Sequence, residues 1–133
     1  MEEVKKSLSK KILVVDDNMD NRELVVKVLK SRGYEMIEAV DGEDALQKVQ
    51  DERPNLILMD ISLPKIDGYE VTRRLKTHEQ YRDIPVVALT AHVMKGDKER
   101  AIEAGCAGYI PKPIDVHELP EQIKHYLEDQ LKR

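Results

Sequence analysis

The chain has 133 residues, 41% of them hydrophobic and 36% charged, which is the size and composition of one globular domain. The formal net charge of −4 gives no basis for binding nucleic acid or an anionic membrane, since both require a basic surface. No apolar run approaches the roughly 20 residues that cross a bilayer, the charged start lacks a secretory signal, and a single cysteine, Cys106, suits a reducing cytoplasm.

Short apolar runs alternate with amphipathic stretches along the chain. The runs are rich in Val, Ile and Leu and have the length of strands that are buried on both faces of a sheet. They cover residues 12–15, 36–39, 56–59, 86–89 and 109–110. A stretch with apolar residues at helical spacing follows each run. The repeating positions are Leu24, Val25, Val28 and Leu29; Ala45, Leu46 and Val49; Val71 and Leu75; Ala101 and Ala104; and Leu119, Ile123, Leu127 and Leu131.

This alternation of five strands with five helices predicts an α/β fold with a parallel sheet and right-handed crossovers. No repeat or long linker divides the chain, so we expect one domain over residues 11–133 after a short charged extension over residues 1–10. The last helix breaks a local rule, because an N-cap at Asp115 would put Pro120 in its second turn. We expect either a kink or a short turn over residues 116–119, with the main helix restarting at Pro120.

Polar residues stand where the strands end. The first strand leads into Asp16 and Asp17, the third into Asp60, the fourth into Thr90 and the fifth into Lys112. Ligands of open α/β sheets bind at these carboxyl ends. If the strand order is 2-1-3-4-5, the ends form one row, and carboxylates on neighbouring strands are close enough to share a metal ion. Clustered carboxylates need a cation, and Mg²⁺ prefers such oxygen ligands.

At these positions the sequence resembles the receiver domain of bacterial response regulators, in the CheY-like superfamily. The matching segments are ILVVDDN (12–18), LILMDISLPKIDGYEV (56–71), IPVVALTA (84–91) and GYIPKPI (108–114). Each segment alone is a weak signal, but the four in this order and spacing carry a resemblance that covers the chain from Lys11 to about Leu131. The resemblance implies a flavodoxin-like, three-layer fold whose five-stranded parallel sheet has the order 2-1-3-4-5.

The resemblance also implies a phosphorylation site. Asp60 would accept a phosphoryl group from a histidine kinase or a histidine phosphotransfer protein, with Mg²⁺ as the cofactor. Asp17 would bind the ion directly and Asp16 mainly through a water molecule. Asp60 and the backbone carbonyl of Ser62 would complete the protein ligands.

Further residues would act on the phosphoryl group once it is attached. Thr90 and the backbone N–H of Ala91 would hydrogen-bond to it, and Lys112 would neutralise one of its oxygens. Tyr109 would be the aromatic switch residue that moves inward together with Thr90. The peptide bond between Lys112 and Pro113 would be cis. We expect phosphorylation to repack residues 91–96 and the helix that follows.

The implied function is a stand-alone phosphoacceptor module that contacts a downstream protein through a face from the fourth strand to the fifth helix. It would be no enzyme beyond catalysing its own phosphorylation and dephosphorylation. The sequence leans towards regulators of cell polarity and division or receivers of hybrid kinases. A receiver detached from a hybrid kinase and a phosphate sink remain alternatives. An aspartyl-phosphate phosphatase of the haloacid dehalogenase type is a distant one, since it expects Asp-x-Asp after the first strand.

Other candidate residues are interpreted as structural. Cys106 stands between two small residues and is expected to be a buried apolar filler. Asp16 or Asp17 also fits the N-cap of the first helix. The four histidines are not at metal-ligand spacing and are expected at the surface. They are His78, His92, His117 and His125.

Overall fold

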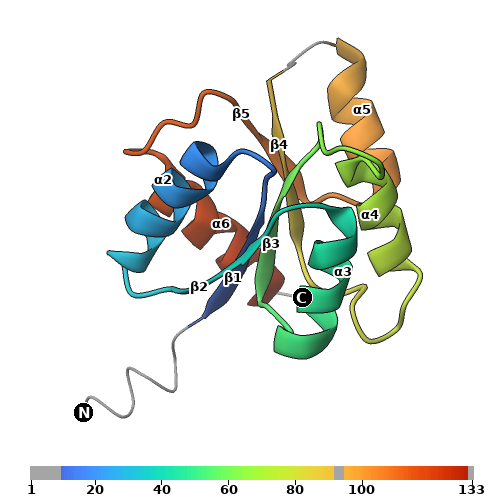
Figure 1. The fold of residues 1–133 in the computed structure, drawn as a ribbon, viewed down its shortest axis with the longest axis horizontal. Helices are drawn as coiled ribbons and strands as arrows, with labels where there is room; N and C mark the ends of the chain where they lie inside the picture. The colour runs from blue at the N-terminus through green and yellow to red at the C-terminus, as the bar shows by residue number, and fades with distance from the viewer. Residues whose placement is uncertain (1–9, 92–94, 132–133) are drawn as a thin grey trace.

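A computed structural model of the chain describes residues 10–91 and 95–131, in which five strands alternate with five helices (Figure 1). The strands are β1 (Lys11–Val15), β2 (Glu35–Ala39), β3 (Leu56–Asp60), β4 (Val86–Thr90) and β5 (Gly108–Pro111). The helices are α2 (Met19–Lys30), α3 (Gly42–Glu52), α4 (Gly68–Lys76), α5 (Lys95–Ala104) and α6 (Leu119–Leu131). The extension predicted over residues 1–10 lies, except for Lys10, outside the described residues.

The five strands form one parallel sheet in the order β2-β1-β3-β4-β5, which confirms the predicted topology. Val15 of β1 pairs with Met59 of β3, and Asp60 pairs with Leu89 of β4. In turn, Thr90 of β4 pairs with Pro111 of β5. The carboxyl ends of four neighbouring strands therefore lie at one edge of the sheet.

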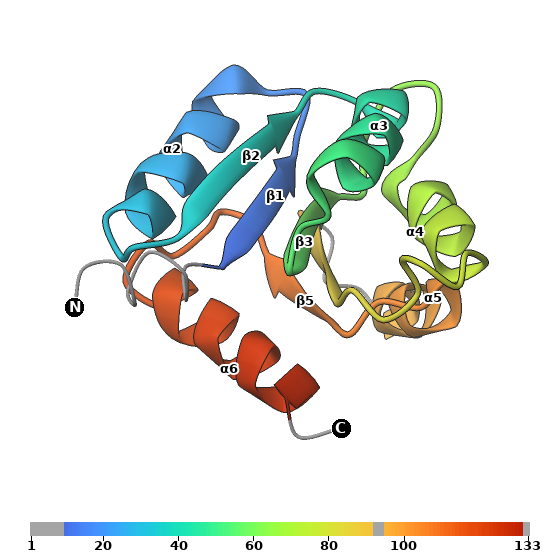
Figure 2. The ribbon, with the colours of Figure 1, turned by 90° about the horizontal axis from the view of Figure 1, so that it is seen from below.

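Helices cover both faces of the sheet and make three layers, with α2 and α6 on one face and α3, α4 and α5 on the other (Figure 2). Side chains of a strand alternate between the faces. Leu13 and Ile57 accordingly pack with the three-helix side, whereas Ile12 and Leu58 pack with the two-helix side. Because both faces are covered, every residue of β3 and β4 is buried. This explains why these strands are continuous apolar runs in the sequence.

Three helices begin at a side-chain cap that accepts a hydrogen bond from the backbone N–H three residues further on. The caps are Asn18 for α2, Asp41 for α3 and Asp67 for α4. Asn18 takes this position because its Oδ1 lies 2.9 Å from the N of Asn21. The alternative expectation that Asp16 or Asp17 caps α2 is therefore wrong.

The last helix resolves the conflict at Pro120 with a short turn rather than a kink. Asp115 accepts hydrogen bonds from the N–H groups of His117 and Glu118, at 2.9 and 3.3 Å. This turn occupies residues 116–118, and α6 starts at Leu119. Pro120 then falls in the first turn of α6, where its missing N–H leaves no helical bond unmade.

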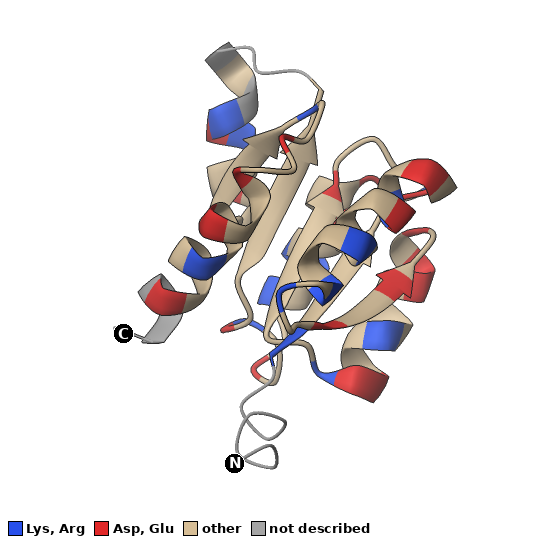
Figure 3. Cartoon of the chain, turned by 90° about the vertical axis from the view of Figure 1, so that its left-hand side faces the viewer, with Lys and Arg blue, Asp and Glu red and all other residues tan. Residues whose placement is uncertain are grey.

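Side chains are placed mostly as the sequence predicts. Cys106 is buried, with 8% of its surface exposed, and the described histidines are exposed; His92 lies outside the described residues. Leu24 differs, since it follows the apolar pattern of α2 and yet is 41% exposed. Charges of both signs lie mainly on helices and at strand ends (Figure 3). No helix in the described part of the chain is long and apolar enough to cross a membrane.

Candidate functional site

Asp60 ends β3 and lies almost completely out of contact with solvent, with 3% of its surface exposed. The N-terminus of α4 packs directly against it. Gly68 leaves no room for a side chain there, because a Cβ on this residue would overlap the carbonyl oxygen of Asp60 and lie 2.9 Å from Cγ of Met59. Glycine at this position therefore lets the helix close over the end of the strand.

A second carboxylate, that of Asp16, follows β1 and is 1% exposed. Asp16, Asp17 and Asp60 each offer an oxygen atom, and these three atoms lie within 4.8 Å of one another. Asp17 is exposed, so the cluster has two buried members and one that faces solvent. This arrangement confirms that the two strand ends bring their carboxylates together.

Lys112, in the loop after β5, supplies the positive charge of the site. Its Nζ lies 3.2 Å from Oδ2 of Asp60 and 3.4 Å from Oδ2 of Asp16. The Lys112 N–H donates to the carbonyl oxygen of Thr90 at 2.8 Å, which fixes the loop to the end of β4. The Lys112–Pro113 peptide is cis, as the resemblance to receiver domains implies.

The remaining oxygen of Asp60, Oδ1, accepts a hydrogen bond from the N–H of Ser62 at 3.0 Å. Ser62 belongs to the loop between β3 and α4, and this loop contains a γ-turn. In the turn, Ile66 N–H donates to the carbonyl of Pro64 at 2.8 Å, around Lys65 at φ 66°. A non-glycine residue in this conformation is strained. The loop that follows Asp60 therefore contains a strained backbone conformation at Lys65.

The other expected site residues lie along β4 and β5. Thr90 is the last residue of β4 and is 7% exposed, and Ala91 follows it at the surface. Tyr109 pairs with Ala88 and is half-buried against the core on the three-helix face. Of the segment expected to repack, residues 92–94 lie outside the described residues. Sequence reasoning missed Gly68, whose role depends on a packing contact, and Arg22, which contacts the backbone of Asp16.

Burial raises the pKa of the Asp60 carboxyl above its usual value, and the nearby Asp16 carboxylate acts in the same direction. The hydrogen bond from Ser62 and the charge of Lys112 oppose the rise in pKa without cancelling it. The native protein therefore holds a proton on Asp60 more tightly than the unfolded chain does. Ionisation of Asp60 consequently reduces the free energy of unfolding as the pH rises.

We expect Asp60→Asn to raise the thermal midpoint of the metal-free protein by a few degrees at pH 7, where wild-type Asp60 bears an unfavourable buried charge. For a domain of this size, about 1 kcal/mol corresponds to roughly 3–5 °C. Below about pH 4, the carboxyl group is protonated in native and unfolded chains alike, so the difference should vanish. Thermal unfolding in EDTA at several pH values measures the difference in midpoint between the two proteins. A mutant less stable than wild type at pH 7 would contradict this assignment.

The donor set suits a hard divalent cation. Three clustered carboxylates repel one another. In the described structure, the ammonium group of Lys112 pairs with two of them, those of Asp16 and Asp60. An all-oxygen set with room for water ligands is what Mg²⁺ requires. The residues therefore fit a magnesium site at the open edge of the sheet.

The fold and this site define a phosphotransfer signalling module, and comparisons with known proteins agree. The model of the response regulator receiver domain matches residues 12–124, and the chain belongs to this family. A polar-differentiation response regulator, DivK of Brucella anthropi, is 46% identical over 122 residues, which are 92% of this chain and 99% of that protein. The chain is thus a signalling module of two-component systems rather than a classical enzyme.

Two solved structures show the same fold. A putative response regulator from Chloroflexus aurantiacus is 34% identical, with a TM-score of 0.86 over 90% of this chain and 98% of its own. The receiver domain of the sensor histidine kinase PA1611 from Pseudomonas aeruginosa is 35% identical, with a TM-score of 0.83 over the same shares. That domain has a magnesium ion coordinated in its active-site cleft. Receiver domains bind Mg²⁺ at an acidic pocket, and they interact with histidine kinases or phosphotransfer proteins and with downstream targets.

Proposed function

We propose that Asp60 accepts a phosphoryl group from a phosphohistidine of a partner protein. The observation that carries the proposal is the position of Asp60, which is fixed by β3 behind it and pairs with Lys112 at 3.2 Å. A carboxylate oxygen of Asp60 would attack phosphorus while the bond to the imidazole nitrogen breaks. The product would be an acyl phosphate on Asp60 and a free histidine on the donor.

Charge neutralisation and positioning supply most of the catalysis in phosphoryl transfer. Lys112 would stabilise negative charge on a phosphoryl oxygen, and Thr90 and the N–H of Ala91 would hydrogen-bond to the group after transfer. Tyr109, two residues from the carboxyl end of β5, would follow the movement of Thr90. These residues would thereby connect phosphorylation to the surface formed by β4, α5, β5 and α6.

Asp16, Asp17, Asp60 and the backbone carbonyl of Ser62 would hold Mg²⁺. When bound, the ion supplies positive charge to the phosphoryl oxygens and offsets repulsion between the incoming group and the carboxylates. The protein residues orient it, since two of the three carboxylates are buried in a fixed arrangement. The same set would support the protein's own dephosphorylation.

The phosphodonor would dock on a surface beside Asp60. A cavity of about 350 Å³ opens between α2 and the loop after β5. It is lined by Asn21, Leu24, Ala91, Lys112, Pro113 and Ile114. Leu24 and Met19 of α2 are 41% and 59% exposed, so they offer apolar contacts to a histidine kinase or phosphotransfer protein. Such docking would account for the exposure of Leu24, which departs from the helical pattern.

The similarity to a polar-differentiation response regulator supports a role in cell polarity or division. A downstream protein partner and a location in the cytoplasm are further parts of the proposal. A receiver detached from a hybrid kinase is the second candidate, favoured by the likeness to the PA1611 receiver domain. A phosphatase of the dehalogenase type is disfavoured, because the described carboxylates come from two strands and Asp60 lies on β3.

The test is phosphorylation by acetyl phosphate in Mg²⁺, measured by intact mass. Wild-type protein is expected to gain one phosphoryl group, and Asp60→Asn is expected to gain none because it lacks the nucleophile. Removing Mg²⁺ with EDTA should suppress the gain. Labelling of Asp60→Asn to the wild-type level would contradict the assignment, and turnover of a generic phosphate ester would favour the phosphatase instead.

A further inference from the structure

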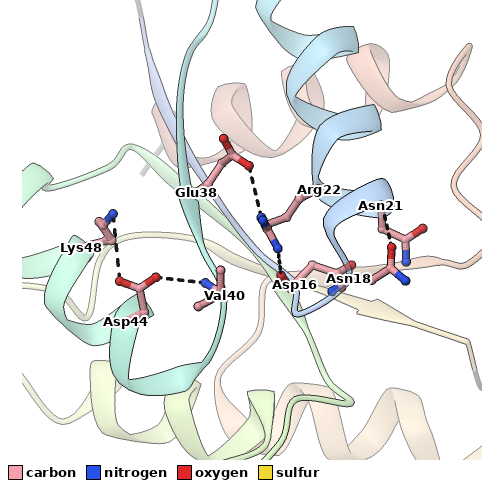
Figure 4. Close-up of polar contacts among 8 residues, drawn as sticks. All are labelled: Asp16, Asn18, Asn21, Arg22, Glu38, Val40, Asp44 and Lys48. Atoms are coloured by element: carbon pink, nitrogen blue, oxygen red, sulfur yellow. Dashed lines mark hydrogen bonds and ion pairs between the residues drawn. The ribbon is translucent and has the colours of Figure 1, made fainter.

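Arg22 of α2 reaches back to the acidic cluster and connects it to the neighbouring strand β2. Its Nη1 donates to the backbone carbonyl oxygen of Asp16 at 2.9 Å, and its Nε lies 3.2 Å from Oε1 of Glu38 (Figure 4). The Arg22 side chain is only 12% exposed. One guanidinium group therefore ties α2, the end of β1 and β2 together.

The carbonyl that Arg22 holds belongs to the peptide bond between Asp16 and Asp17. The preceding peptide is held as well, since Asp16 N–H donates to the carbonyl of Ala39 at 3.1 Å. On the carboxylate side, Oδ1 of Asp16 accepts from the N–H of Asn18 at 2.9 Å. These contacts fix the plane from which both carboxylates project.

Asp17 depends on this plane more than Asp16 does. Among the backbone groups and side chains that the structure describes, none donates a hydrogen bond to the Asp17 carboxylate, and the residue is exposed. The backbone therefore sets the direction of its Cα–Cβ bond, and no described hydrogen bond holds the rest of the side chain. A rotation of the Asp16–Asp17 peptide would move this carboxylate away from Asp60, although the two side chains now offer oxygens within 4.8 Å.

Glu38 reduces the repulsion between Arg22 and a cation in the acidic cluster. An unpaired guanidinium near the cluster would repel a divalent ion, but the ion pair with Glu38 compensates its charge. Glu38 is 45% exposed at its side chain, so the pair itself contributes little to stability. Arg22 therefore contributes to the acidic cluster by orienting its backbone rather than by adding positive charge.

We propose that Arg22 is a positioning residue for the divalent cation, acting through the Asp16–Asp17 peptide. This inference rests on the proposed function, since it assumes that the three carboxylates hold Mg²⁺. Residues that orient metal ligands without touching the metal typically change metal affinity by about 10–100-fold when replaced. Arg22→Met, which keeps the length of the side chain but removes its donors, is expected to weaken Mg²⁺ binding by about tenfold or more.

The experiment is a calorimetric titration of the full chain with Mg²⁺, together with thermal unfolding in EDTA and in Mg²⁺. Glu38→Gln leaves an acceptor for Nε and the bond to Asp16 but removes the compensating charge. Because the Glu38 side chain is 45% exposed, solvent and salt screen that change, so the Mg²⁺ affinity should stay within about threefold of wild type. The lysine in Arg22→Lys can reach only one of the two acceptors, so the Mg²⁺ affinity of this variant should lie between those of wild type and Arg22→Met. This variant keeps the inference testable if Arg22→Met fails to fold. The matched control is Arg73→Met, which breaks the exposed Arg73–Glu70 pair on α4.

The outcomes separate the inference from the proposed function. Wild-type Mg²⁺ affinity in both Arg22 variants would overturn the inference. An equal loss of Mg²⁺ affinity in Glu38→Gln and Arg22→Met would overturn it too, because the cause would then be the balance of charges rather than the position of the peptide. A purely structural role would lower the midpoint equally in EDTA and Mg²⁺, whereas positioning reduces the rise that Mg²⁺ produces. If the wild-type protein neither binds Mg²⁺ nor becomes phosphorylated, the proposed function is wrong as well.

Discussion

Gly68→Ala is expected to destabilise the protein by about 2–3 kcal/mol and to slow phosphorylation by tenfold or more. Helix propensity alone predicts the opposite sign, because alanine gains about 1 kcal/mol over glycine within a helix. The new Cβ, however, would lie 3.0 Å from Cα of Ile61 and would overlap the carbonyl oxygen of Asp60. Both are backbone atoms at the end of β3, so relief requires α4 or Asp60 to move.

Urea unfolding and acetyl phosphate labelling measure the two effects of Gly68→Ala. The matched control is Gly96→Ala in α5, since a Cβ on Gly96 would meet nothing within 4 Å. That substitution should be neutral or stabilise the protein by about 0.4–1 kcal/mol. A Gly68→Ala protein as stable as the Gly96→Ala control would show that α4 does not close tightly over Asp60.

The fold could be predicted from the sequence because each strand carries its own signal. The run of residues 56–59 is apolar at every position, as burial on both faces requires, and it continues into Asp60 as the structure shows. The order of the strands could not be predicted in this way, since periodicity does not determine which strands are neighbours. That order came from the resemblance, and the pairing of β1 with both β2 and β3 confirms it.

The candidate site could be predicted only in part, for a related physical reason. Asp16, Asp60 and Lys112 mark strand ends, so the parallel topology alone brings them to one edge. Arg22 has no such signal: it is one of 22 Lys and Arg residues, and its role depends on a contact between a helix, a backbone carbonyl and Glu38. Gly68 is similar, because close packing against a strand end is visible only in three dimensions.

The charges of the acidic cluster are only partly balanced. Two buried carboxylates, those of Asp16 and Asp60, share the ammonium group of Lys112, which leaves them short of one positive charge. Burial is the main cause of the raised pKa of Asp60, and the nearby Asp16 carboxylate adds to the rise. A divalent cation therefore has a binding energy available from relief of repulsion, in addition to that of coordination.

Lys112→Met should accordingly have the largest effect on stability among charge substitutions at this site. At pH 7 without metal, we expect a loss of about 2–4 kcal/mol, since the carboxylates of Asp16 and Asp60 would stay buried without a counter-ion. The estimate is below that for a fully buried pair because the Lys112 side chain is 19% exposed. Phosphorylation should also slow, because no ammonium group would neutralise the transferred group.

Two conditions should restore the stability of Lys112→Met, and each isolates the electrostatic cause. Protonation of Asp60 removes part of the uncompensated charge, and its pKa is raised in the native protein, so the loss should shrink as the pH falls towards about 4. Mg²⁺ supplies the missing charge, so it should raise the midpoint of the variant more than that of wild type. Lys48→Met, which removes only an exposed pair with Asp44 at 4.0 Å, should show neither dependence. A loss in Lys112→Met that is independent of pH and Mg²⁺ would instead indicate that the aliphatic stem of Lys112 stabilises the loop by packing.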